Sequence, residues 1–237
     1  MNTLTESLAL ALEMIRSADP ALGQIVALSL RVSISACLIG AVFGLLLGAW
    51  LAVARFPGHG LLVGLLNTLL ALPSVVVGLL VYLLLSRSGP LGSWGLLFTP
   101  AAMIVAQSIL VVPLIAALAR RLVLDGLNDG GDQLHSLGAG PLTSALLLLA
   151  HARLGVLTVL LTAFGRALAE VGAVMMVGGN INGLTRVMTT AIALETSKGD
   201  LPLALALGIV LLTVVAALNL LIGLLHRQSG TPGAVWA

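Results

Sequence analysis

Charged residues are scarce in this sequence. Only 8% of its 237 residues are Asp, Glu, Lys or Arg, whereas 59% are hydrophobic and the mean hydropathy is +1.15. Soluble domains carry about 25% charged residues, so a chain with this composition cannot cover its own surface in water. The composition excludes an ordinary soluble domain and predicts an integral membrane protein of the all-α class, a polytopic helix bundle.

Residues that form disulfides or hold metals are scarce as well. Cys37 is the only cysteine and lies in an apolar run, which excludes a disulfide framework and a cysteine-based metal site. The four histidines share no ligand spacing, so we expect no metal and no cofactor. The net charge is only +2 and the basic residues are dispersed, so we expect no nucleic-acid partner. Residues 1–20 lack a basic start followed by an apolar core, so no cleavable signal peptide is expected.

Long apolar runs are what the chain does contain. Each of five runs is long enough for the roughly 20 residues of a spanning helix, which predicts five transmembrane helices. The runs lie near residues 24–54, 60–86, 99–121, 154–178 and 201–225. Together they form a predicted transmembrane domain over residues 21–226.

The two ends of the chain differ from this domain. In residues 2–17 the apolar positions recur at helical spacing opposite charged ones, which predicts an amphipathic helix on the membrane surface within an N-terminal segment, 1–20. The last residues, 227–237, are rich in Ser, Gly and Pro and are predicted to form a loose C-terminal tail.

The longest polar interruption, residues 125–153, sets the predicted orientation. With this loop in the cytoplasm, the basic residues satisfy the positive-inside rule weakly, and the Arg120–Arg121 pair leads directly into the loop. The inner side then holds Arg55, Arg120, Arg121, Arg153 and Arg227, and the outer side holds Arg16, Arg87, Arg186 and Lys198. The N-terminus is accordingly expected outside and the C-terminus inside.

The same loop has the pattern of two short helices. Asn128 or Asp129 is suited to cap a helix through Leu137, the residues 138–140 turn the chain, and Pro141 suits the first position of a helix over residues 142–152. Leucines at 134 and 137 give the first helix a narrow apolar face, the shape that seats in a groove of another protein. The alternative is an ordinary cytoplasmic helical hairpin.

Small residues recur every four positions in the first apolar run. They are Ala36, Gly40, Gly44, Gly48 and Ala52. Lipid gives apolar helices no reason to associate, so close backbone approach along such a ladder supplies the contact. The ladder predicts tight helix packing, and two alternatives stay open for its partner helix, one from this chain and one from another copy.

Polar and ionisable groups interrupt the other runs. Arg166 and Glu170 stand one turn apart in the fourth run, where a charge at the bilayer centre costs roughly 2.5–3.5 kcal/mol. Three interpretations stay open: an ion pair that locks helix packing, groups that line a polar translocation path or gate, and a pair that carries protons. Breaks at Asn67, Pro73 and Gln107 fit a bundle around a polar cavity, and they also occur as simple kinks.

The outer segment from residue 178 to 200 contains an apolar stretch, 187–194, that is too short to span a membrane. Thr185 is suited to cap it as a helix. The segment is therefore either a short helix beside the gate or a packed outer loop.

The loop and several flanking segments resemble the permeases of ABC importers. Those proteins carry a cytoplasmic loop of pattern E-A-A-x3-G-x9-I-x-L-P, and this chain has Asp132-Gln133-Leu134, three residues, Gly138, and Leu148 at the Ile position. It departs from the pattern at the Glu, at both alanines and at the final Leu-Pro. Residues 67–82, 86–92, 164–180 and 185–200 resemble tungstate-type permeases of the molybdate/tungstate group, and the resemblance runs from about residue 24 to 225.

This resemblance implies a type I importer fold, a homodimeric permease, and two copies of a separate ATP-binding subunit. An extracytoplasmic binding protein would deliver the oxyanion, most closely tungstate, with molybdate as the alternative, to a permease in the cytoplasmic membrane. The helix that would couple to the ATPase comprises Asp132, Gln133, Leu134, Leu137, Gly138 and Ala139. The residues of the translocation path or gate would be Arg166, Glu170, Asn67, Pro73 and Gln107.

The residues themselves agree with a transport subunit that is not an enzyme. The sequence has no G-x4-G-K-[ST] phosphate loop, and its one lysine, Lys198, lies in Ser-Lys-Gly-Asp. ATP hydrolysis is therefore expected in another polypeptide. A nucleophile–base constellation is also missing. An ion-coupled secondary transporter remains the alternative class, although no internal repeat supports it.

Overall fold

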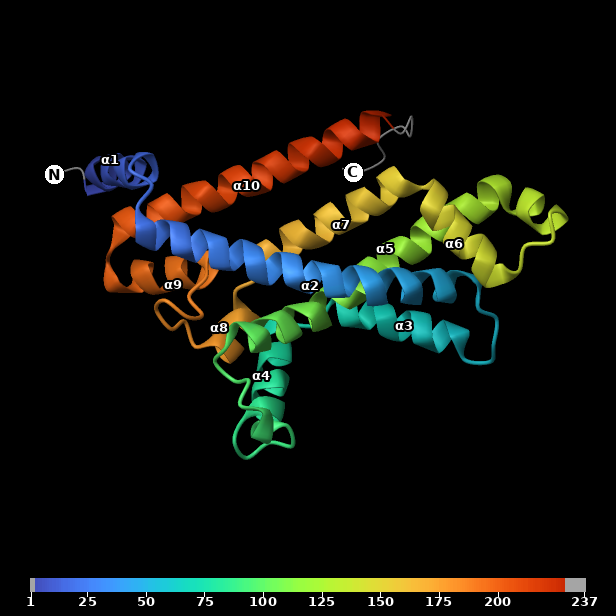
Figure 1. Cartoon of the computed structure of the whole chain (residues 1–237), viewed down its shortest axis with the longest axis horizontal. Helices are drawn as coiled ribbons and strands as arrows, with labels where there is room; N and C mark the ends of the chain where they lie inside the picture. The colour runs from blue at the N-terminus through green and yellow to red at the C-terminus, as the bar shows by residue number, and fades with distance from the viewer. Residues whose placement is uncertain (1–2, 229–237) are drawn as a thin grey trace. The chain divides into compact units, whose positions relative to one another are not determined.

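A computed structural model of the chain describes residues 3–228, and every regular element in that range is helical (Figure 1). The elements are α1 (Thr3–Arg16), α2 (Pro20–Val53), α3 (His59–Leu70), α4 (Ser74–Leu85), the 3-10 turn η1 (Gly92–Trp94), α5 (Pro100–Ser136), α6 (Pro141–His151), α7 (Arg153–Leu168), α8 (Gly172–Gly178), α9 (Met188–Lys198) and α10 (Leu201–Gln228). The predicted all-α membrane class is confirmed. The predicted tail beyond residue 228 lies outside the described residues.

Three helices, α2, α5 and α10, are each long and apolar enough to cross a membrane. Two further pairs, α3 with α4 and α6 with α7, reach that length only if each pair is counted as one broken span, which raises the number from three to five. The fourth apolar run differs from the continuous helix expected over residues 154–178, because α7 ends at Leu168 and α8 begins at Gly172.

The chain divides into two compact units, each built from three stretches of sequence. The first unit comprises residues 1–36, 73–107 and 166–217, and the second comprises residues 37–72, 108–165 and 218–237. The long helices α2, α5, α7 and α10 each contribute residues to both.

The glycine ladder of α2 packs against α5 in the second unit. A methyl group added at Gly40 would lie 2.9 Å from a Val111 side-chain carbon, and one added at Gly44 would lie 2.7 Å from Cβ of Ile115. At Gly48 the added group would meet the backbone of Ala116. The partner helix of the ladder therefore belongs to the same chain, which resolves the alternative that the sequence left open. We call this contact the α2–α5 seam.

The predicted separate helix in the polar loop is wrong. The third run continues as α5 without a break from Pro100 to Ser136, through Gln107, Pro113 and both predicted cap residues, 128 and 129. Leu127 on this extension packs, together with Leu148 of α6, against a buried cluster of the second unit. This apolar contact holds the extension as one helix, so no cap is needed where the apolar run ends.

The turn that follows matches the sequence pattern. Gly138 has φ of +77°, the left-handed conformation that favours glycine, and the Ala139 N–H donates to the Leu134 carbonyl at 3.1 Å. Gly140 then precedes Pro141, which occupies the first turn of α6 as predicted.

The N-terminal helix is present as predicted and belongs to the first unit. Ser7 and Ala11 of α1 are buried, whereas Leu8, Leu10 and Leu12 are 40–50% exposed. The helix therefore packs through its small residues and leaves leucines on its surface, which suits a helix in contact with lipid.

Candidate functional site

The charged pair predicted for the path lies where the fourth run is broken, in the first unit. Glu170 occupies the segment between α7 and α8 and is buried, with 4% of its side chain exposed. Its Oε2 accepts a hydrogen bond from Nη1 of Arg166 at 3.1 Å. Its Oε1 accepts the N–H of Ala173, near the start of α8, at 3.1 Å. One carboxylate therefore both pairs with Arg166 and caps the helix that follows.

Side chains from distant elements satisfy the backbone at this break. Gln107 of α5 donates its amide to the Ala167 carbonyl at 3.0 Å, and Thr189 of α9 donates its hydroxyl to the Glu170 carbonyl at 2.7 Å. The Ala167 carbonyl also accepts the N–H of Glu170 at 3.2 Å. A buried carbonyl without any partner is costly, and the Thr189 hydroxyl provides a partner for the Glu170 carbonyl. We call this set, Gln107, Arg166, Ala167, Glu170 and Thr189, the α7–α8 break.

Arg166 is the residue of the α7–α8 break whose charged side chain is exposed. Its side chain is 54% exposed, whereas Glu170 is buried, so the guanidinium keeps donors that the carboxylate does not occupy. Arginine donors suit tetrahedral oxyanions, which accept hydrogen bonds on several oxygens. The pair can therefore hold its position through Glu170 and offer hydrogen bonds through Arg166.

The start of α4 lies against the same region. A methyl group added at Gly172 would come within 2.6 Å of a Val75 side-chain carbon and 2.8 Å of Oγ of Ser74. Further along, one added at Gly78 would lie 2.7 Å from Cα of Ala173. Pro73 immediately precedes α4, with φ of −62° and an extended ψ of 125°. The structure thus brings Pro73, Gln107, Arg166 and Glu170 into one unit.

Asn67 is placed differently. It lies on α3 in the second unit and its side chain is exposed.

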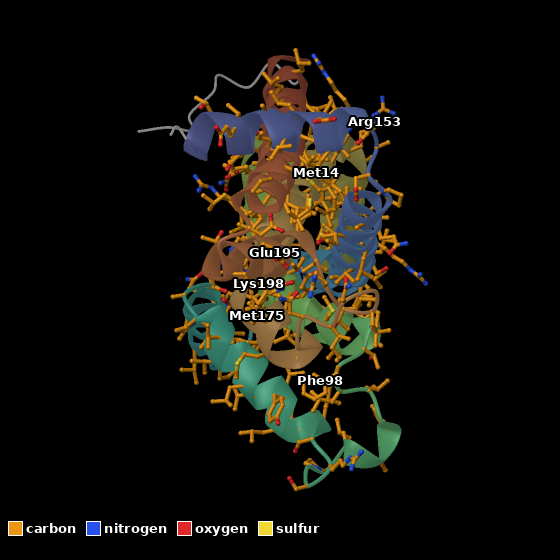
Figure 2. The ribbon with its side chains drawn as sticks, turned by 90° about the vertical axis from the view of Figure 1, so that its left-hand side faces the viewer. Met14, Phe98, Arg153, Met175, Glu195 and Lys198 are labelled. Carbon is orange, nitrogen blue, oxygen red and sulfur yellow. The ribbon has the colours of Figure 1, made fainter. Side chains whose placement is uncertain are left out.

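The other end of α8 is closed by aromatic contacts. Phe98, labelled in Figure 2, donates its N–H to the Val177 carbonyl at 3.0 Å and has φ of +61°. Its ring lies 6.2 Å from that of Tyr82 on α4, and a methyl group added at Gly179 would meet it at 2.8 Å. These contacts hold α4 and α8 together over their lengths.

The outer segment contains a helix, α9. It begins at residue 188, one residue after the start of the predicted stretch, and ends at residue 198, four residues beyond its predicted end. Thr185 does not cap it: the Thr185 hydroxyl is bonded instead to the Gly178 carbonyl and accepts the N–H of Ile181 at 3.0 Å. The hydroxyl of Thr190 accepts the N–H of Val187, the residue before the helix, at 3.1 Å. Of the two alternatives left open by the sequence, the helix is the one present. The predicted cap is wrong, because the Thr185 hydroxyl is bonded within the preceding loop.

A buried carboxylate with two cations occupies the second half of α9. Oε1 of Glu195 lies 3.1 Å from Nζ of Lys198 and 3.5 Å from Nη1 of Arg186. Figure 2 labels Glu195 and Lys198 on this helix. Glu195 is 6% exposed and Lys198 50% exposed, so the pair runs from the interior to the surface.

The residues predicted to contact an ATPase lie at the end of α5 and in the turn after it, in the second unit. Leu137 is 82% exposed, Gln133 and Gly138 are exposed, and Leu134 and Ala139 are partly buried. For Asp132 the backbone lies within α5. The predicted apolar face is thus split, because Leu134 turns partly inward and Leu137 points outward.

Sequence reasoning missed the polar residues that hold α9, namely Ser29, Asn180, Thr189 and Thr190. Ser29, Thr189 and Thr190 stand among mostly apolar neighbours, and that contrast was the available signal, whereas Asn180 lies in a polar, glycine-rich loop. Their partners lie up to 159 residues away, so the sequence did not indicate what they bind.

Comparison with known proteins identifies the family, although no protein-family model matches the chain. The chain is 41% identical over 232 residues to the tungstate uptake system permease protein TupB of Peptoclostridium acidaminophilum, covering 96% of this chain and 100% of the relative. It is 42% identical over 214 residues to a probable anion ABC transporter permease protein of Haloferax volcanii, covering 88% and 91%. It is 34% identical over 189 residues to the molybdenum transport system permease protein ModB of Escherichia coli K12, covering 75% and 82%.

The first of these matches covers nearly the whole chain at 41% identity. The chain therefore belongs to the family of ABC-transporter permease subunits, integral proteins of the cytoplasmic membrane that transport and do not themselves catalyse a reaction.

Proposed function

We propose that the chain is the permease subunit of an ATP-driven importer of a tetrahedral oxyanion, with tungstate as its main substrate. The observation that carries the proposal is the 41% identity over the full length of a tungstate permease. Identity to the molybdenum permease is lower, at 34%, and identity to the sulfate permease CysT of Escherichia coli K12 is 28%. Molybdate is the second candidate, because tungstate and molybdate share their charge and shape.

A permease of an ABC import system works with an ATPase and with a substrate-binding protein. The missing phosphate loop supports the assignment of ATP hydrolysis to the separate subunit. In the proposed assembly two copies of this chain form a homodimer and bind two ATPase subunits. The end of α5 and its turn, with Leu137 exposed on the surface, form the proposed contact with each ATPase.

The proposed path passes the α7–α8 break. Arg166 is half exposed in a stretch that is otherwise apolar, and its charge is stable there only beside protein or water. A path that binds its ion too strongly cannot release it, and Glu170 offsets the charge of Arg166. In this proposal Pro73, Gln107 and Asn67 complete the path or gate.

Uptake measurements in cells that lack their own tungstate and molybdate importers test the function. We expect tungsten to accumulate, by mass spectrometry of the cell metal content, only when the permease, its ATPase and its binding protein are all expressed. An equal molar amount of added molybdate should lower the tungsten accumulation only slightly. Uptake without the ATPase would instead indicate a secondary transporter, and stronger uptake of molybdate would select the second candidate.

Substitutions at Gly138 test the contact with the ATPase. Its φ of +77° is costly for residues with a Cβ, roughly 1–2 kcal/mol, and asparagine tolerates it best. Gly138→Val should therefore reduce co-purification of the ATPase more than Gly138→Asn, while both variants still insert in the membrane. Gly130→Ala is the matched control, because it lies within α5 and has open space around its Cβ position. Equal recovery of the ATPase with all three would contradict the proposed contact.

A further inference from the structure

The first helical turn of α9 is tied directly to the α7–α8 break. Thr189, the second residue of α9, reaches the Glu170 carbonyl across 19 positions of sequence. The side chain of Thr189 is buried, with 7% exposed, so water does not compete for this carbonyl. A displacement of α9 at this point therefore moves or breaks a bond to the segment that carries Glu170.

The start of α9 is also held from a second side. The N–H of Met188 donates to Oγ of Ser29 on α2 at 2.7 Å, and the same hydroxyl donates to the Ile25 carbonyl at 2.8 Å. Ser29 and Met188 are both buried. The position of Thr189 is consequently fixed by its neighbour Met188 and does not depend on the Glu170 bond alone.

The loop before α9 adds a third attachment. Asn180 has a left-handed φ of +52°, its amide donates to the Thr190 carbonyl at 3.2 Å, and its Oδ1 lies 3.0 Å from the Thr190 hydroxyl. Thr190 and Ala191 are fully buried. In contrast, residues 196–200 at the other end of α9 are exposed. The N-terminal end of α9 is thus held by hydrogen bonds next to the α7–α8 break, whereas the residues at its C-terminal end are exposed.

We propose that Thr189 is a positioning residue of the transport path, through which α9 sets the orientation of the Arg166–Glu170 pair. The Glu170 carboxylate stays bonded to the N–H of Ala173, so the pair turns together with the backbone that Thr189 holds. A displacement of α9 then changes the position of Arg166 through the backbone of Glu170. This inference rests on the proposed function, because it takes the pair to be part of the path.

The test compares two threonine variants, one that loses a bond to another segment and one that loses a bond within its own helix. Thr189→Val keeps the shape of the side chain and removes its donor. We expect tungstate uptake per ATP hydrolysed to fall roughly fivefold in liposomes that contain the permease–ATPase complex, with binding protein outside and ATP inside. Thr213→Val is the control, because the Thr213 hydroxyl bonds to the Ile209 carbonyl of its own helix at 2.7 Å. Thr189→Ser restores the donor and should restore the ratio.

A labelling measurement gives a readout besides transport. Because Cys37 is the only cysteine, Cys37→Ala provides a background in which Ala169→Cys, an exposed position at the break, is the single thiol. Its rate of reaction with a maleimide should change roughly fivefold on adding Thr189→Val and stay unchanged on adding Thr213→Val. This measurement tests the inference even if the wild-type complex fails to move tungstate, which would count against the proposed function.

Three results with the Thr189 variants would overturn the inference. One is a wild-type ratio of uptake to hydrolysis in Thr189→Val, and another is an unchanged labelling rate. The third is a loss of transport that Thr189→Ser does not rescue and that parallels a loss of thermal stability, which indicates a purely structural bond. If Thr189→Val does not fold, Ser29→Ala loosens α9 without touching Glu170. That variant should lower the same ratio by a smaller factor, and a wild-type ratio would contradict the proposal.

Discussion

The α2–α5 seam and the α7–α8 break hold membrane helices together by opposite means. At the seam, Gly40, Gly44 and Gly48 bring two backbones so close that added methyl groups would overlap α5. At the break, Gln107 and Thr189 occupy carbonyls that a continuous helix would have bonded itself. The seam depends on shape and contains no polar side chain among these contacts, whereas the break depends on hydrogen bonds and contains a charged pair.

The difference indicates which region suits a moving part. Two closely packed helices in lipid cannot move apart at low cost, because their separation leaves a gap that no side chain fills. Hydrogen bonds to a broken helix can exchange partners or bind water when the surroundings change. We therefore expect substitutions at the seam to reduce the amount of folded protein, and substitutions at the break to reduce transport more than folding.

The largest effect is expected from Gly48→Ala. The added methyl group would meet the Ala116 carbonyl, which is backbone, and would lie 2.8 Å from Cβ of Ala119 and 2.9 Å from the Arg120 nitrogen. None of these atoms can move without shifting α5, so we expect a loss of about 1–3 kcal/mol or more. Gly64→Ala on α3, with open space at its Cβ position, is the control. Thermal unfolding in detergent measures the difference in stability between the two variants. Equal stability would show that α5 shifts to accommodate the added methyl group at little cost.

Next in size is Glu170→Ala. This change leaves the Ala173 N–H and Arg166 without their partner, at a cost of about 1–3 kcal/mol for the buried N–H alone. Uptake should fall further than the amount of folded protein, because the pair is proposed to line the path. Glu170→Gln retains an acceptor for Ala173 and should recover stability but not uptake. Recovery of both by Glu170→Gln would assign the pair to packing, as at the seam.

A smaller effect is expected from Gly40→Ala. Here the added methyl group meets only side-chain tips, a Val111 methyl at 2.9 Å and Cδ1 of Ile115 at 3.0 Å, which can rotate. The loss should be about 1 kcal/mol, at the low end for overpacking. The comparison with Gly48→Ala uses the same unfolding measurement. A loss as large as that at Gly48 would mean that the whole seam is equally rigid.

The smallest effect on stability is expected from Gln107→Leu. The variant loses the bond to the Ala167 carbonyl, worth about 1 kcal/mol, and it also removes Oε1, a buried oxygen that has no partner among the described residues. These changes offset each other, so unfolding should shift little while uptake declines. Unchanged uptake would remove Gln107 from the proposed path and leave the break held by Thr189.

The fold class and the apolar helices were predictable because each depends on local composition. Runs of about 20 apolar residues need no distant partner to be recognised, and α2, α5 and α10 follow them. The turn at Gly138 was predictable for the same reason, since glycine and the following proline specify it within four residues. The separate helix expected in the loop failed because apolar packing of Leu127 extends α5 past its apolar run.

The candidate site was predictable only in part. Arg166 and Glu170 stand out as charges in an apolar run, so the pair was found and its 3.1 Å contact follows from the one-turn spacing. The break itself was not expected, because the residues from 154 to 178 read as one helix. Thr189 was missed, since its importance comes from a carbonyl 19 positions earlier.

The sequence by itself determined that this is a membrane protein, where its long helices lie, and which charged residues fall within them. These features are local or compositional, so each can be read without knowing what folds against what. Only the tertiary structure decided that α5 of the same chain fills the glycine ladder, and that α9 and Gln107 hold the break at Glu170. Those features are contacts between residues far apart in sequence, and the spacing of residues along a chain does not specify which distant groups meet.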